Sequence, residues 1–126
     1  MTIAVVADNV RPVDKNIMTV RVISNDTITA GDVVYHNGTG LAVADDDTST
    51  ASANCIGVAL KDAATGIYTD VLTCGRVTGW TGLTAGMICY VSDAGVVAAS
   101  AGTKNFAVGW ALSTTDIYVH PFAPVA

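Results

Sequence analysis

The chain repeats part of its own sequence, and this repeat limits the folds open to it more than any other feature. Residues 29–35, Thr-Ala-Gly-Asp-Val-Val-Tyr, align without a gap on residues 84–90, Thr-Ala-Gly-Met-Ile-Cys-Tyr. Two further blocks follow in the same order: Cys55–Leu60 aligns on Ala107–Leu112, and Ile67-Tyr68 aligns on Ile117-Tyr118. The copies span about residues 28–72 and 83–120. They predict two similar halves that pack together, because a few short strands cannot cover both of their own faces.

Composition places these halves in the all-β class. Val, Ile and Thr supply 18, 8 and 16 of the 126 residues, and the sequence contains no Glu and no Gln. β-Branched residues favour strands, whereas Glu and Gln are among the better helix formers. The turn signals Asn37-Gly38 and Asp93-Ala94-Gly95 lie between apolar runs, as in β-hairpins, and the repeat aligns Leu41 on Val96 just after them. The sequence predicts a small domain like a β-barrel or a β-sandwich, with an internal two-fold repeat.

The first 16 residues lie outside both copies. They are predicted to form an extended N-terminal arm or an edge strand, because Arg11-Pro12 disfavours a helix. Residues 17–126 are predicted to form a single β domain. Within it, apolar residues alternate with polar ones over residues 18–22, which indicates a half-buried strand, and again over residues 67–72. Residues 75–82 are predicted to be a glycine-rich bridge between the halves, and residues 42–53 to end in a polar loop.

Charge, hydropathy and cysteine content exclude several classes of protein. Six Lys and Arg against 11 Asp give a net charge of −5, so the chain cannot form the large basic face with which proteins bind nucleic acid. No apolar run approaches the length of about 18 residues that a membrane helix needs, and the N-terminus does not resemble a signal peptide. Cys55, Cys74 and Cys89 are an odd number with wide spacing. That favours buried free thiols in a reducing compartment over a disulfide framework.

The sequence contains few residues of the types that act in catalysis or bind metal ions. His36 and His120 are the two histidines, and a pair with Cys74 or Cys89 would make a cysteine-dependent hydrolase. Neither cysteine, however, has the helix start or the basic neighbours that activate a thiol. No Cys or His spacing fits zinc, and the run Asp45-Asp46-Asp47 lacks the glycine and the distal glutamate of a calcium-binding loop. We therefore predict no enzyme, no cofactor and no metal.

Aromatic residues are the remaining candidates for ligand contact. Trp80 and Trp110, together with the four tyrosines, would make a platform on which sugar rings stack. Against this, Tyr35 and Tyr90 are equivalent in the repeat, and Trp110 takes the place of Val58. Equivalent positions of this kind are typical of a core, so the sequence favours a core role for Trp110.

The first copy also carries a family resemblance. It lies in Thr-Ala-Gly-Asp-Val-Val at 29–34, Ile-Gly-Val-Ala-Leu-Lys-Asp-Ala-Ala-Thr-Gly at 56–66, and Val-Leu-Thr-Cys-Gly-Arg-Val at 71–77. With these segments the chain resembles the small capsid decoration (cement) proteins of tailed bacteriophages. The resemblance covers about residues 28–78. Residues 83–120 match the same pattern less well, and Met87 stands there in the place of Asp32.

The resemblance implies a structural protein that binds the exterior of an assembled phage head. Such proteins often act as homotrimers and stabilise the capsid by bridging neighbouring capsomers. The expected partner is the major capsid protein of a tailed phage, and the expected location is the outside of the virion, after synthesis in the host bacterial cytoplasm. The alternative is a fibre-associated or tail-associated glycan-binding module.

The arm is the candidate capsid contact. Its residues are Ile3, Val5, Val6, Val10, Arg11 and Pro12. An extended apolar segment can add a strand to a sheet edge of the capsid protein, where backbone hydrogen bonds supply affinity. The alternative is that the arm completes the domain's own sheet. Modest affinity per copy is enough on a symmetric shell, because trimerisation makes the attachment multivalent.

Overall fold

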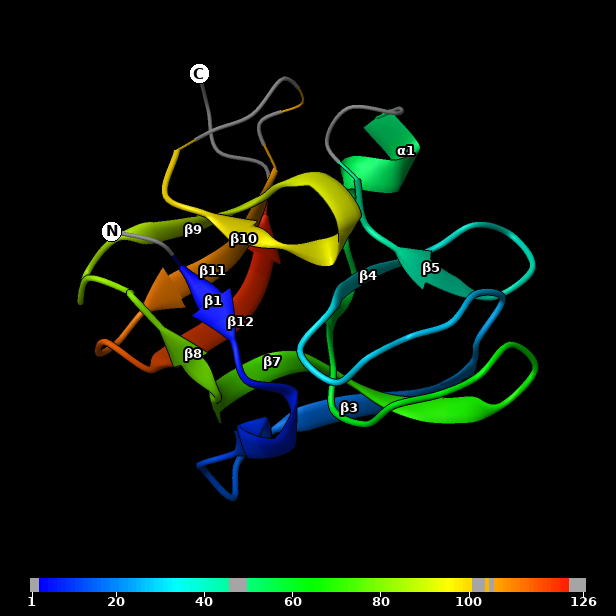
Figure 1. Ribbon diagram of the computed structural model, residues 1–126, viewed down its shortest axis with the longest axis horizontal. Helices are drawn as coiled ribbons and strands as arrows, with labels where there is room; N and C mark the ends of the chain where they lie inside the picture. The colour runs from blue at the N-terminus through cyan, green and yellow to red at the C-terminus, as the bar shows by residue number, and fades with distance from the viewer. Residues whose placement is uncertain (1–2, 46–49, 101–103, 105, 123–126) are drawn as a thin grey trace.

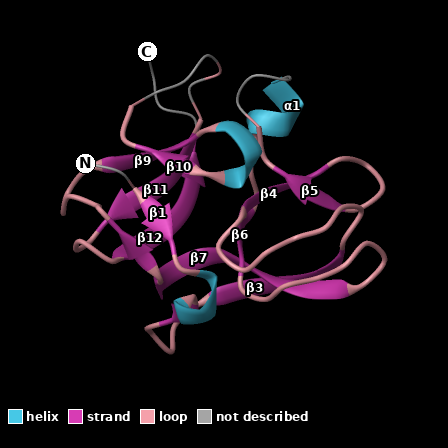
Figure 2. Cartoon of the chain, viewed as in Figure 1, coloured by secondary structure: helices cyan, strands magenta, loops and turns pink. Residues whose placement is uncertain are grey.

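The computed structural model describes residues 3–45, 50–100, 104 and 106–122, and its main regular elements are strands (Figure 1). The strands are β1 (Ala4–Val5), β2 (Arg11–Pro12), β3 (Met18–Ile23), β4 (Val33–His36), β5 (Leu41–Val43), β6 (Gly57–Ala59), β7 (Tyr68–Thr78), β8 (Trp80–Thr81), β9 (Ile88–Val91), β10 (Val97–Ala98), β11 (Ala107–Ala111) and β12 (Asp116–Phe122). Single helical turns form η1 (Ala7–Asn9), α1 (Thr50–Ala53) and η2 (Asp93–Gly95) (Figure 2). The all-β class predicted from composition is confirmed.

The long strand β7 joins the two halves of one curled antiparallel sheet, which forms a half-barrel. The strand order is β10-β9-β11-β12-β7-β6-β4-β5. The first part of β7 pairs with β6 and β3, and residues 75–78 pair with β12 and β2. Residues 75–78, which were predicted to begin a glycine-rich bridge between the halves, do connect them, and they do so as a continuation of strand β7. Gly75 stays within it because its missing side chain leaves room for Ile17.

The two halves contain the same strand register. The amide of Gly31 donates to the carbonyl of Ala59 at 2.8 Å, and in the second half Gly86 donates to Ala111 at 2.8 Å. The equivalent ladder pairs are Val33–Val58 and Ile88–Trp110, Val34–Gly57 and Cys89–Gly109, Val58–Leu72 and Trp110–Tyr118, and Ala59–Val71 and Ala111–Ile117. Residues 33–34 and 88–89, and residues 57–59 and 109–111, therefore occupy equivalent places in the two halves.

The ladders correct the alignment of the last repeat block. Ile117 pairs with Ala111 as Val71 pairs with Ala59, so the residues equivalent to Ile117-Tyr118 are Val71-Leu72 and not Ile67-Tyr68. The identical residues mislead because residues 60–67 separate β6 from β7, whereas only residues 112–115 separate β11 from β12.

The second hairpin shifts by one residue. Tyr90 pairs with Ala98 as Tyr35 pairs with Ala42, which makes Val97 the equivalent of Leu41 in place of Val96. The turn of the second hairpin contains the η2 helical turn, which changes the length of the connection.

The halves stack in the same orientation, one behind the other. We name the two faces of each half-sheet after equivalent residues: the Val58/Trp110 face and the Ala59/Ala111 face. The main core contains Val33, Val58 and Leu72 from the first half and Cys89, Ala111 and Ile117 from the second. The Val58/Trp110 face of the first half therefore packs on the Ala59/Ala111 face of the second half.

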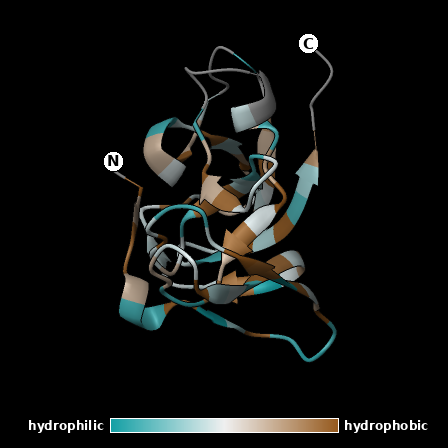
Figure 3. Ribbon diagram, turned by 90° about the vertical axis from the view of Figure 1, so that its right-hand side faces the viewer, coloured by the Kyte–Doolittle hydropathy of each residue, from teal (hydrophilic) through white to brown (hydrophobic). Residues whose placement is uncertain are grey.

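A smaller core lies on the other side of the first half. It contains Ile28, Val34, Leu41, Ala59, Ala63 and Val71. Since these residues belong to the Ala59/Ala111 face of the first half or cover it, this face is closed within the chain. At the opposite end, the Val58/Trp110 face of the second half is outermost. In Figure 3, β12, the strand that leads to the label C, runs along the right-hand side of the molecule, and no other strand lies outside it.

The strand predicted over residues 18–22 is present as β3, but its predicted half-buried character is wrong. Residues 18–21 are all exposed, on both faces of the strand. The reason is topological: among the described strands β3 pairs only with β7, and of its residues Val22 alone packs against a core cluster, the smaller one. The alternation of apolar and polar residues predicted the strand correctly, but it does not indicate whether another part of the chain packs on the apolar side of that strand.

Candidate functional site

The arm lies against the chain's own strands. β1 pairs with β8, the amide of Val6 donates to the carbonyl of Gly79 at 2.7 Å, and β2 pairs with Val77 and Thr78 of β7. Of the six arm residues, Val10 is buried, Ile3 is half-buried, and Val5, Val6, Arg11 and Pro12 are exposed. In this structure the arm completes the domain's own sheet, which is one of the two alternatives open from the sequence.

The pairing of the arm leaves one edge of it open. β1 and β8 form a separate two-stranded sheet, and no other described strand pairs with β1. Beside this edge, Val5 and Val6 are 38% and 42% exposed. An edge strand with free backbone groups and apolar side chains is a template for adding another strand.

An apolar cavity of about 270 Å³ lies beneath the arm. Ile3 and Val5 line it from the arm, and Trp80, Val96 and Val97 line it from the second half. A side chain on Gly31 would collide with Val5, so the glycine of the first repeat turn is required where the arm crosses it.

One carboxylate, that of Asp32, lines the same cavity. Burial raises its pKa above the usual range, although the carboxylate also accepts a hydrogen bond from the amide of Thr29 at 2.9 Å. A cavity lined mainly by aliphatic side chains with one half-buried carboxylate does not provide the acid and base pair that hydrolysis needs.

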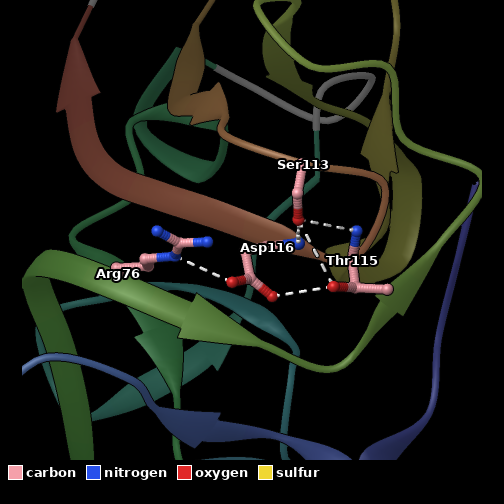
Figure 4. A network of polar contacts seen from close by, with 4 residues as sticks. All are labelled: Arg76, Ser113, Thr115 and Asp116. Carbon is pink, nitrogen blue, oxygen red and sulfur yellow. Dashed lines mark hydrogen bonds and ion pairs between the residues drawn. The ribbon is translucent and has the colours of Figure 1, made fainter.

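Asp116, at the start of β12, lies in a network of polar contacts with Arg76, Ser113 and Thr115 (Figure 4). Its Oδ2 accepts from the Arg76 Nε at 2.7 Å, and its Oδ1 accepts from the Thr115 hydroxyl at 2.8 Å. Burial alone would raise the pKa of Asp116, but hydrogen bonds from Thr78, Thr115 and Arg76 outweigh it and lower the pKa. Both oxygens of this carboxylate thus have a partner within the fold, so the network positions β12.

The structure separates the cysteines into two kinds. Cys55 and Cys89 are buried free thiols, as predicted, and burial raises the pKa of each to about 12. Cys74 is half-buried and lines a shallow depression together with His120. Its Sγ contacts the Tyr118 hydroxyl at 3.4 Å. Cys74 and His120 are thus the one cysteine–histidine combination that the described chain brings near a common depression, and the thiol contacts the phenol of Tyr118.

The two tryptophans lie in different environments. Trp80 is 3% exposed and belongs to the main core, so it cannot serve as a sugar platform. Trp110 is 36% exposed, and the prediction of a core role for it is wrong. Its ring stacks on Phe122 at 4.9 Å between centroids, and His120 lies 6.1 Å away. The signal in the sequence was size: an indole stands where the equivalent core position holds a valine.

Over the part of the chain that the structure describes, no three His, Cys, Asp or Glu side chains come together as metal ligands do. Asp45 is described, whereas Asp46 and Asp47 lie outside the described residues. No described helix has the length and apolar character needed to cross a membrane.

Comparison with known proteins adds no relative to this description. No protein-family model, no curated protein and no solved structure matches the chain. Two features of the described residues face outward with apolar groups at a strand edge or a sheet face: the open edge of β1 and the aromatic face around Trp110.

Proposed function

We propose that this chain is a structural virion protein that binds the exterior of an assembled tailed-phage head and stabilises it by bridging capsomers. The observation that carries the proposal is the open edge of β1, with Val5 and Val6 exposed beside it. A strand of the major capsid protein that pairs with this edge would gain backbone hydrogen bonds and cover both valines.

The overall character of the chain fits this role. A charge of −5 disfavours contact with the packaged DNA, and the resemblance of residues 28–78 points to decoration proteins. In this proposal the protein acts without catalysis, without a cofactor and as a homotrimer. Multivalent attachment then lets a short strand contact in each copy hold the shell together.

The first test is the copy number of the protein in purified virions of the encoding phage. Quantitative mass spectrometry would give the ratio to the major capsid protein, and a decoration role over the whole shell requires a ratio of order one to one. A handful of copies per virion, or none, contradicts the proposal.

The second test locates the contact. Co-sedimentation with heads that lack the protein is measured for the wild type, for Val6→Asp and for Ile67→Asp. Val6 lies beside the β1 edge, whereas Ile67 is 55% exposed on the turn before β7. We expect Val6→Asp to weaken binding at least about tenfold and Ile67→Asp to leave it unchanged, because only the first places a charge in the apolar contact. Equal binding by both variants would remove the arm from the contact.

A second candidate function is glycan binding by a fibre-associated or tail-associated module, and the exposed ring of Trp110 favours it. Sugars stack on exposed aromatic faces, and Trp80 is too deeply buried to report on such a ligand. Tryptophan fluorescence titrated with cell-surface oligosaccharides tests this function. A saturable change that Trp110→Val abolishes supports it, and a flat response with the wild type excludes it for those sugars.

A further inference from the structure

The outermost sheet face of the second half is not explained by the arm or by the core. This open face is the Val58/Trp110 face of that half, and it carries Ile88, Tyr90, Trp110, Tyr118, His120 and Phe122. Trp110 lies at its centre: Ile88 and Tyr118 flank it on the neighbouring strands, and Phe122 stacks on its ring. Three strands therefore contribute large apolar groups to one continuous surface.

In the first half, the equivalent face is covered by another half-sheet. There the equivalents of Ile88, Trp110 and Tyr118 are Val33, Val58 and Leu72, and all three are 0% exposed. The second half of the same chain covers them. Trp110 is 36% exposed, because none of the described residues forms a further layer over it. Within the chain, the Val58/Trp110 face of the first half is thus already packed against a half-sheet of the same architecture.

The other end of the stack cannot serve as that partner. The Ala59/Ala111 face of the first half is closed by residues of the chain itself: Ile28 is 1% exposed, and Leu41 and Val71 are 0% exposed. Stacking the open face of one copy on the closed end of the next would gain no further burial there. Two open faces, by contrast, can bury their aromatic groups against each other, and contact between identical faces gives a closed assembly.

Charge also favours contact between copies at this place. The chain carries a net charge of −5, so two copies repel each other through their net charge. None of the six residues of the open face is Asp, Lys or Arg. The nearest cation by strand pairing, Arg76 opposite Tyr118, is already bonded to Asp116 at 2.7 Å. The open face itself therefore carries no fully charged side chain, and the anion that acts on it is Asp14: the hydrogen bond with Cys74 and, after it, the charge of Asp14 raise the pKa of Tyr118.

We propose that copies of this chain associate through the open face of the second half, with Trp110 at the centre of the contact. The inference rests on the self-association included in the proposed function and names the surface that performs it. In a two-fold pair, Trp110 is buried by contact between two identical open faces, whereas in the trimer implied by the resemblance the open face would bury it against a different surface of the next copy. The arm lies on a different part of the fold and remains available to the capsid protein.

Mass in solution tests this inference without phage heads. Sedimentation equilibrium of the purified wild type at about 100 µM is expected to give the mass of two or three copies, since useful self-association of a virion protein requires micromolar affinity or better. Trp110→Lys is expected to weaken the association at least tenfold. The matched control, Ile67→Lys, places the same charge on an exposed apolar residue away from the face and is expected to associate as the wild type does.

A second readout does not depend on any variant. Trp80 is buried, so the tryptophan emission of the wild type changes on dilution only through Trp110, and dissociation is expected to shift it to longer wavelength. A wild type that is monomeric at 100 µM, or a Trp110→Lys variant that associates as the wild type does, overturns the inference. If the wild type is monomeric and binds heads, while the Trp110→Lys variant folds but does not bind heads, the open face contacts the capsid protein instead of a second copy. Association without head binding would contradict the proposed function and leave this inference intact.

Discussion

Gly57 and Gly109 lie at positions where the backbone of the paired neighbouring strand comes too close for a side chain. A Cβ atom on Gly57 would overlap the carbonyl oxygen of Leu72, and one on Gly109 would overlap the carbonyl oxygen of Tyr118. Both glycines have a strand on each side, so neither neighbour can move away without breaking ladder hydrogen bonds. The two halves therefore depend on the same missing side chain.

Gly57→Ala is expected to lower the free energy of unfolding by more than about 3 kcal/mol, because the added methyl group overlaps backbone and not a flexible side chain. Gly38→Ala is the matched control. Gly38 has φ +100° and no atom within 4 Å of its Cβ position, so only backbone strain of about 1–2 kcal/mol is expected. Urea unfolding measures both variants, and equal losses would contradict the close approach of β6 to β7.

The buried thiols give the protein a dependence on alkaline pH. The pKa of Cys55 and of Cys89 is raised from 9.0 to about 12 by burial, so the unfolded chain releases these protons before the folded one does. The stability that the two thiols contribute is complete below about pH 9 and is lost as the pH rises toward about 12. We expect the free energy of unfolding to fall between pH 8.5 and about 10.5, and to fall less steeply in a Cys55→Ala/Cys89→Ala double variant. Parallel pH profiles would show that these thiols are not buried.

At the scale of elements, β12 is attached to β7 by strand pairing and by the Asp116 network. The Asp116 side chain is only 10% exposed, and its bond to Arg76 is 2.7 Å long. Arg21 and Asp70 form a second ion pair between β3 and β7, but their closest atoms are 3.7 Å apart and the side chains are 70% and 32% exposed. The chain thus contains a shielded and a solvated ion pair for direct comparison.

Asp116→Asn is expected to lower the free energy of unfolding by about 1–3 kcal/mol, since it removes charge-assisted hydrogen bonds from a shielded site. Asp70→Asn is expected to change it by less than about 1 kcal/mol, because the pair is screened by water. The lowered pKa of Asp116 means that its contribution is present above about pH 3.8 and is lost as the pH falls further. Acid unfolding of the two variants checks this: the Asp116→Asn profile should be flatter than that of the wild type below pH 3.8. Equal effects of both substitutions would contradict the network's role.

At the scale of the whole molecule, the main core belongs to neither half alone. Val58 and Leu72 come from the first half, Ala111 and Ile117 come from the second, and all four are at most 1% exposed. β7 also pairs with strands of both halves. The halves are therefore expected to fold as one cooperative unit.

Separate fragments 1–82 and 83–126 are accordingly expected to be unfolded. Each fragment would expose one side of the main core, and the second would also lose the strand that pairs with β12. Circular dichroism with thermal unfolding measures this, and the intact chain should show a single transition. A cooperative transition in fragment 1–82 alone would show that the first half is an independent domain.

Local patterns in the sequence determined the all-β class, most strand positions, the two hairpin turns and the burial of Cys55 and Cys89. These depend on neighbouring residues: β-branched side chains favour extended backbone, and Asn-Gly favours a tight turn. The same information was insufficient for Trp110, for β3 and for the equivalence of Ile117 with Val71. Strand alternation identifies two faces, but which face is covered depends on what packs against it.

Only the tertiary structure decided three further matters. It placed the arm on the chain's own β8 and β7, it continued β7 through Gly75 into the second half, and it stacked the halves in one orientation. Because the halves stack in the same orientation, the Val58/Trp110 face is buried in the first half and open in the second half. The exposure of Trp110 follows from that arrangement, because the end of a stack has no next layer to cover it.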